Sequence, residues 1–182
     1  MSLPRIVVLG AGLGGTIAAY EIREAVRDKA DIMVISDQEN YWFVPSNPWV
    51  AVRWREPEAI SVHLPPVMKR KGIAFTAVGA KRVHPEANRV ELNDGSFVDY
   101  AYLVIATGPD LAFDEIEGFG PEANTVSICS TPHAAAAADA FDRFCDDPGP
   151  IVVGAAQGAS CYGPAYEFAL ILDTELKRRK IR

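Results

Sequence analysis

The fold is specified by residues 4–19, Pro4-Arg-Ile-Val-Val-Leu-Gly-Ala-Gly-Leu-Gly-Gly-Thr-Ile-Ala-Ala19. The apolar run at 6–9 is typical of a strand buried in a parallel sheet. Gly10, Gly12 and Gly15 follow as G-x-G-x-x-G, where this strand would turn into a helix. The first glycine permits the tight turn, the second lets the backbone approach a pyrophosphate, and the third lets the helix pack closely on the strand. The motif in this context predicts a dinucleotide site with its phosphates at a helix N-terminus.

The next residues complete a strand-helix-strand unit. Four apolar residues of the helix share one face, namely Ala18, Ile22, Ala25 and Val26. A second buried strand is expected at 32–35. An acidic residue after this strand normally binds the adenosine ribose. Ser36 occupies that position and Asp37 follows it, so Asp37 is either the ribose ligand or only a turn residue.

Composition limits the class of protein. A chain of 182 residues is long enough for one large domain or two small ones. Its net charge of −6 argues against a nucleic-acid surface. No apolar run reaches the roughly 20 residues of a membrane-spanning helix, and no signal-peptide core precedes the first strand. Three cysteines are too few for a secreted disulfide scaffold, so we expect a cytoplasmic protein.

Residues 41–57 combine aromatic residues with prolines, and each X-Pro step disfavours helix. We interpret this segment as a surface loop held by its aromatic side chains, and the alternative is a rigid wall beside a flat cofactor. Strands are expected at 73–78 and 102–106, the latter ending at Thr107-Gly108. Between them, Asn93-Asp94-Gly95 is a strong turn signal for an antiparallel hairpin within 82–100.

The second half of the chain begins another unit of the same kind. Thr131 is expected to cap a helix whose apolar stripe includes Cys145. A buried strand at 151–153 and a helix at 164–180 should follow, with a solvated basic end at 177–180. The turn between them resembles a dinucleotide motif, but Ala156 replaces its middle glycine, and a Cβ there would crowd a pyrophosphate.

The predicted fold is therefore α/β, a Rossmann-like domain with an inserted antiparallel β-meander, followed by the first βα unit of a second Rossmann-like domain. We expect a dinucleotide-binding segment at 1–112, a connecting segment with a helix at 113–150, and an incomplete second domain at 151–182. The unpartnered second unit indicates a fragment of a longer protein.

Four residues carry the candidate redox chemistry. Cys161 lies at or just before a helix N-terminus, where the dipole favours the reactive thiolate. The alternative is a small buried residue. Cys129 also precedes a helix, and a core cysteine at a strand end is an equal alternative. His133 and Glu167 follow the two cysteines closely, so they are either proton carriers or ordinary surface groups.

The whole chain resembles the N-terminal part of the bacterial sulfide:quinone oxidoreductases, which belong to the FAD-dependent disulfide-oxidoreductase-like flavoproteins. The resemblance rests on the glycine motif and four further segments: Phe43-Val-Pro-Ser-Asn-Pro-Trp49, Tyr102-Leu-Val-Ile-Ala-Thr-Gly-Pro109, Ser127-Ile-Cys129 and Gly158-Ala-Ser-Cys-Tyr-Gly-Pro-Ala-Tyr-Glu167. The proline-rich segment and the two cysteine segments are the more specific ones.

The resemblance implies FAD as cofactor, sulfide as electron donor, a membrane quinone as acceptor, and zero-valent sulfur or polysulfide as product. The resemblance also implies that Cys161 is one cysteine of a redox-active pair and that Cys129 assists in handling sulfur. His133 and Glu167 would carry protons. The implied cofactor contacts are Gly10, Gly12, Gly15, Ser36, Asp37, Asn47, Pro48, Val78, Thr107 and Gly108. No metal and no nucleic acid are implied, and a homo-oligomer is one alternative for the assembly.

Parts of the resembling enzymes would lie beyond Arg182: the partner of Cys161, the quinone pocket and the surface that makes the protein peripheral to the inner membrane. The fragment alone should be inactive. The alternatives are the flavin subunit of a flavocytochrome c sulfide dehydrogenase, a type-II NADH dehydrogenase, which needs a true second glycine motif, and a non-catalytic FAD-binding module.

Overall fold

The computed structural model describes residues 3–159 and 162–181, and the chain divides into two compact units. Unit 1 comprises Met1–Tyr41 and Val62–Asp110, and unit 2 comprises Trp42–Ser61 and Leu111–Arg182. Each unit has a hydrophobic core of its own. The strands β3 (Asn40–Trp42) and β4 (Ser61–His63) pair as a small two-stranded sheet.

A four-stranded parallel sheet forms the centre of unit 1, in the order β5-β2-β1-β9. Its strands are β1 (Arg5–Leu9), β2 (Asp31–Ile35), β5 (Ala74–Thr76) and β9 (Tyr102–Ile105). Val7 of β1 is opposite Met33 of β2 and Leu103 of β9, so the three strands end at the same edge. The parallel α/β sheet predicted from the sequence is confirmed.

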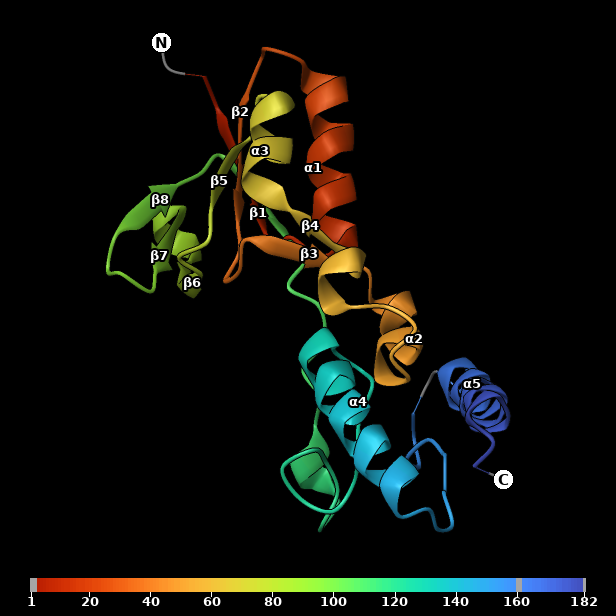
Figure 1. Cartoon of the computed structure of the whole chain (residues 1–182). Helices are drawn as coiled ribbons and strands as arrows, with labels where there is room; N and C mark the ends of the chain where they lie inside the picture. The colour runs from red at the N-terminus through yellow and green to blue at the C-terminus, as the bar shows by residue number, and fades with distance from the viewer. Residues whose placement is uncertain (1–2, 160–161, 182) are drawn as a thin grey trace. The chain divides into compact units, whose positions relative to one another are not determined.

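Both faces of this sheet are covered (Figure 1). Helices α1 (Leu13–Val26) and α3 (Leu64–Arg70) lie on one face, where Val8 and Val34 pack with Ala19 and Met68. An antiparallel meander lies on the other, made of β6 (Ala80–His84), β7 (Arg89–Leu92) and β8 (Phe97–Asp99). Burial on both faces explains why the two central strands, β1 and β2, read as continuous apolar runs. The expected meander is confirmed.

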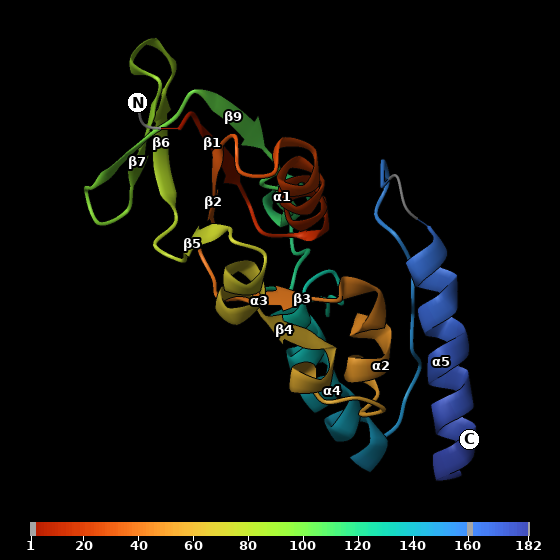
Figure 2. The same cartoon turned by 90° about the horizontal axis from the view of Figure 1, so that it is seen from above.

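Unit 2 is helical. Its main helices are α2 (Asn47–Ala51), α4 (Thr131–Asp146) and α5 (Gly163–Arg179), and α2 contacts both of the others (Figure 2). The core is formed by Val52, Phe141, Ile171 and Leu172. Short 3-10 turns complete the two units: η1 (Val44–Ser46), η2 (Pro57–Ile60), η3 (Pro85–Ala87) and η4 (Phe113–Glu115).

The structure corrects the prediction of a surface loop at 41–57. This segment contains η1 and α2, η2 begins at its last residue, and Asn47, Pro48 and Val50 are buried. Pro48 is accommodated because it lies in the first turn of α2, where a helix makes no use of the missing N–H. The local X-Pro rule was outweighed by burial in the core of unit 2.

Four smaller expectations also change. The segment 151–153 is no strand, and Val152 is 95% exposed, because the described residues offer it no neighbouring strand. Ser130, rather than Thr131, caps α4 by accepting a hydrogen bond from the His133 N–H. The basic end of α5 is only partly solvated, since Arg179 is half-buried and bonds to Glu175. In α1 the buried face includes Ala19, whereas Ala25 is exposed.

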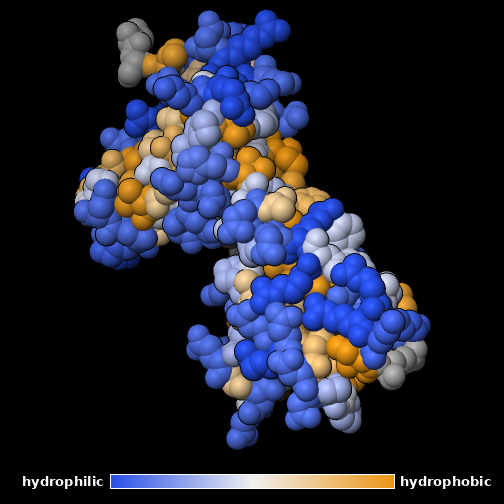
Figure 3. All heavy atoms as spheres, viewed as in Figure 1, coloured by the Kyte–Doolittle hydropathy of each residue, from blue (hydrophilic) through white to orange (hydrophobic). Residues whose placement is uncertain are grey.

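The surface in Figure 3 is mainly hydrophilic, with small apolar areas between charged side chains. Within 3–159 and 162–181, no helix has both the length and the hydropathy required to cross a membrane.

Candidate functional site

The glycine turn between β1 and α1 has the geometry of a dinucleotide cradle. Gly10 has φ +94°, and a Cβ added there would overlap the carbonyl oxygen of Ala106. A Cβ at Gly15 would overlap the carbonyl oxygen of Gly10, so α1 packs directly on the backbone of the turn that follows β1. A Cβ at Gly12 would meet no described atom within 4 Å. The open space at Gly12 therefore fits a pyrophosphate that approaches the backbone.

The other predicted contacts of unit 1 lie at the same edge of the sheet. They follow the carboxyl ends of three strands: Ser36 and Asp37 after β2, Val78 after β5, and Thr107 and Gly108 after β9. In open α/β sheets this edge is where ligands bind. The topology therefore brings these five residues to the edge that carries the glycine turn.

Ser36 and Asp37 differ in what they can offer a ribose. Ser36 is buried, its N–H donates to the Thr76 carbonyl at 2.9 Å, and its carbonyl accepts from Gly79 N–H at 2.7 Å. Its hydroxyl accepts from the Gln38 N–H at 3.3 Å. Asp37 is exposed. Within this pair, the Asp37 carboxylate is the group exposed at this edge of the sheet.

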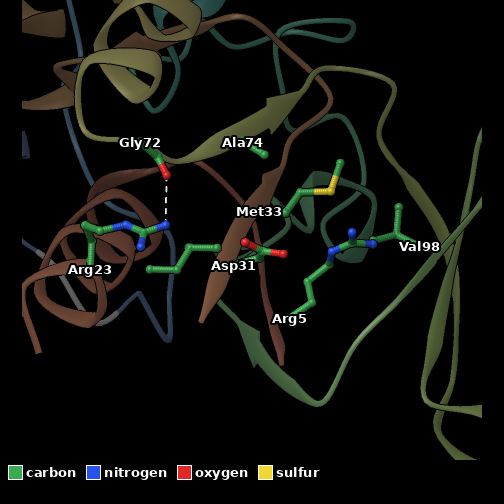
Figure 4. Close-up of a pocket in the computed structure, with 8 residues that line it drawn as sticks. Arg5, Arg23, Asp31, Met33, Gly72, Ala74 and Val98 are labelled. Carbon is green, nitrogen blue, oxygen red and sulfur yellow. Dashed lines mark hydrogen bonds between the residues drawn. The ribbon is translucent and has the colours of Figure 1, made fainter. Parts of the chain in front are cut away.

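A shallow hollow lies at the opposite, amino edge of the sheet (Figure 4). Arg5 and Asp31, the first residues of β1 and β2, help to line it. Arg23 also lines it, and its guanidinium donates to the Gly72 carbonyl at 2.8 Å. None of the predicted site residues lines this hollow.

The candidate redox residues that the structure describes lie in unit 2. Cys129 is exposed in the loop before α4, and its N–H donates to the Ser127 hydroxyl at 3.1 Å. His133 lies in the first turn of α4, with its ring centroid 5.7 Å from that of Phe113. Its Nδ1 is buried and has no hydrogen-bond partner among the described residues. Cys129 is therefore an exposed thiol beside a helix start, and no core residue.

The remaining predicted residues are distributed over α2 and α5. Asn47 and Pro48 lie in α2, both buried. Glu167 is exposed on α5. Cys161 lies outside the described residues. The described helix α5 begins two positions after it, at Gly163.

One buried polar cluster in unit 2 was not predicted from the sequence. Glu175 of α5 is 1% exposed and accepts hydrogen bonds from Trp54 Nε1 and Arg179 Nε, both at 2.7 Å. Burial acts to raise the pKa of Glu175, but the bonds from Arg179 and Trp54 hold that pKa below its ordinary value. A glutamate at helical spacing with the buried Ile171 and Leu172 was the signal available in the sequence.

The two described thiols should differ in reactivity. Cys145 is packed against the core of unit 2, and burial raises its pKa, although Arg179 acts to lower it. Cys129 is exposed. We therefore expect iodoacetamide to alkylate Cys129 at least about tenfold faster than Cys145 at pH 8, because thiolate fraction and access both set the rate. Peptide-resolved mass spectrometry measures the two rates in one sample, and equal rates would contradict the placement of Cys145.

A parallel sheet with a glycine turn at its carboxyl edge defines a Rossmann-like dinucleotide-binding protein. The chain belongs to the pyridine nucleotide-disulphide oxidoreductase family, which matches residues 4–155. The members of this family are oxidoreductase enzymes. Because the chain belongs to the family, it is part of an FAD-binding flavoprotein, as predicted.

Two curated relatives and one solved structure extend the comparison. The chain is 44% identical over 97% of its length to the sulfide-quinone reductase of Aquifex aeolicus, and 24% identical over 100% to the mitochondrial sulfide:quinone oxidoreductase of Dictyostelium discoideum. It covers 40% of each relative. The crystal structure of the Aquifex aeolicus sulfide:quinone oxidoreductase matches 98% of this chain with a TM-score of 0.91 and 43% identity, and the match spans 41% of that chain.

Proposed function

We propose that this chain is the dinucleotide-binding and cysteine-bearing part of a sulfide:quinone oxidoreductase. The observation that supports it most is the 44% identity to a sulfide-quinone reductase, which extends over 97% of the chain and so includes both units. The open backbone at Gly12 supports the cofactor site independently. The proposed substrates are sulfide and a quinone, with zero-valent sulfur or polysulfide as product.

In this proposal the glycine turn binds the pyrophosphate of FAD, Asp37 bonds the ribose, and Val78, Thr107 and Gly108 line the same edge. When bound, FAD supplies the two-electron acceptor for thiol chemistry. The N-terminus of α5 favours the thiolate form of Cys161, whose pair partner would belong to a further part of the enzyme. Cys129 handles sulfur, and His133 and Glu167 carry protons.

The organisation proposed for the chain is a cofactor segment at 1–112, a connecting segment at 113–150 and the start of a second nucleotide-binding-like domain at 151–182. The complete enzyme would be peripheral to the inner membrane on its cytoplasmic side. The relatives do not favour the flavocytochrome c alternative.

The proposal predicts that Cys161→Ala abolishes reduction of the flavin by sulfide. The test is an anaerobic sulfide titration of the FAD-loaded full-length gene product, followed by the visible absorbance of the flavin. The wild type should bleach, and Cys161→Ala should stay yellow because no thiolate can pass electrons to the flavin. Cys145→Ala is the matched control and should bleach at the wild-type rate. Bleaching of Cys161→Ala at that rate would remove Cys161 from the mechanism.

A further inference from the structure

The side chain of Asn47 joins α2 to the loop that carries Cys129. Asn47 is 0% exposed, and its amide N–H donates to the carbonyl oxygen of Ile128 at 3.0 Å. Its Oδ1 accepts a hydrogen bond from the hydroxyl of Thr131, also at 3.0 Å. One amide therefore binds the chain on both sides of Cys129, once before it and once two residues after it.

This amide is the long-range part of a set of hydrogen bonds around Cys129. The other bonds are local: Cys129 N–H donates to the Ser127 hydroxyl, and the Ser130 hydroxyl accepts from His133 N–H. Local bonds of this kind fix a turn but do not attach it to the rest of a unit. The attachment comes from Asn47, which is 81 residues away from Ile128 and 84 from Thr131.

Burial makes this attachment specific. A buried amide whose donor or acceptor is left unpaired costs the full desolvation of that group, so Asn47 favours the loop conformation that satisfies both of its ends. The Cys129 side chain itself remains exposed. The result is an accessible thiol on a backbone that is held in place from two sides.

We propose that Asn47 is a positioning residue for Cys129, with Thr131 as its partner. This role differs from the flavin contact that the sequence resemblance implies for Asn47. Its importance for turnover rests on the proposed function of Cys129 in sulfur handling, whereas its effect on the loop does not.

The first test compares Thr131→Val with Thr131→Ser by amide hydrogen exchange on this chain. Valine has the shape of threonine without the hydroxyl and leaves Asn47 Oδ1 unpaired, whereas serine keeps the hydroxyl. We expect the amides of Cys129 and His133 to exchange about tenfold faster in Thr131→Val, the factor that corresponds to one lost hydrogen bond. Thr131→Ser should exchange at the wild-type rate.

Amides in the last turns of α4, such as that of Arg143, serve as the internal reference and should be unchanged in both variants. If the amides of Cys129 and His133 exchange in Thr131→Val at the same rate as in the wild type, the inference is overturned. An acceleration spread equally along α4 would overturn it too, because it would show a general loss of stability.

The second test measures sulfide turnover by the FAD-loaded full-length gene product. If Asn47 and Thr131 act through Cys129, Thr131→Val should slow turnover in the wild-type background and have no further effect in Cys129→Ser. Equal slowing in both backgrounds would overturn the positioning role. If Cys129→Ser alone turns over normally, the proposed function of Cys129 fails, and the exchange experiment still decides whether Asn47 holds the loop.

Discussion

Replacing Gly12 with alanine is expected to weaken FAD binding about 100-fold, roughly 2.7 kcal/mol, while leaving the stability of the chain within about 0.5 kcal/mol of the wild type. The reason is that a Cβ at Gly12 meets no described atom within 4 Å, yet it fills the space where a pyrophosphate approaches the backbone. Fluorescence titration with FAD and urea unfolding followed by circular dichroism measure the two quantities.

Two neighbouring glycines provide the comparison. Gly15→Ala should weaken FAD binding and also destabilise the chain. Its Cβ would overlap the carbonyl oxygen of Gly10, and moving α1 away from the turn costs about 3 kcal/mol or more. Gly14→Ala is the matched control: Gly14 is exposed within α1 and has free space around its Cβ position. It should bind FAD as the wild type does. Unchanged FAD binding by Gly12→Ala would show that the glycine turn is not the cofactor site.

The features that could be predicted from the sequence are those encoded within a few residues. The run 6–9 with the three glycines gave the parallel sheet and its turn, because a buried strand and a positive φ at Gly10 each demand particular residue types. The hairpin turn at Asn93-Asp94-Gly95 was predictable for the same reason. Local chemistry was sufficient in each case.

The features that were missed depend on contacts between distant residues. The prolines of 41–57 indicate a loop when they are considered alone, but Asn47 is bonded to Ile128 and Thr131, and Val50 packs with Ala134. The strand expected at 151–153 had the right composition, but a strand forms only when another strand supplies its hydrogen bonds. Neither fact is visible within a window of sequence.

The distinction between Ser36 and Asp37 also depends on tertiary structure. The sequence places Ser36 where the acidic residue usually stands and leaves Asp37 as either the ribose ligand or only a turn residue. In the structure the backbone of Ser36 bonds to Thr76 and Gly79, its buried hydroxyl accepts from the Gln38 N–H, and Asp37 is exposed. Which of two adjacent polar residues can reach a ligand is decided by the neighbouring strand and its loop.

Replacing Glu175 with leucine should destabilise unit 2 by about 2–4 kcal/mol, because it leaves Trp54 Nε1 without its acceptor and removes the carboxylate that pairs with Arg178 and Arg179. Tryptophan fluorescence during urea unfolding is a direct measurement, since Trp42, Trp49 and Trp54 all lie in unit 2. Lys177→Ala is the control on the same helix. It removes an exposed ion pair with Asp173 and should cost at most about 0.5 kcal/mol.

The pH dependence of the stability difference between the wild type and Glu175→Leu tests whether the buried carboxylate causes it. The pKa of Glu175 is lower in the folded chain than its ordinary value, so its charge stabilises the fold fully at pH values above the ordinary carboxylate pKa of about 4.3. That contribution is lost as the pH falls through the lower, folded-state pKa. The gap between wild type and Glu175→Leu should therefore be constant from pH 6 to 8 and shrink below about pH 4. A gap that stays the same down to the acid transition would show that packing, and not the buried carboxylate, holds α5 against Trp54.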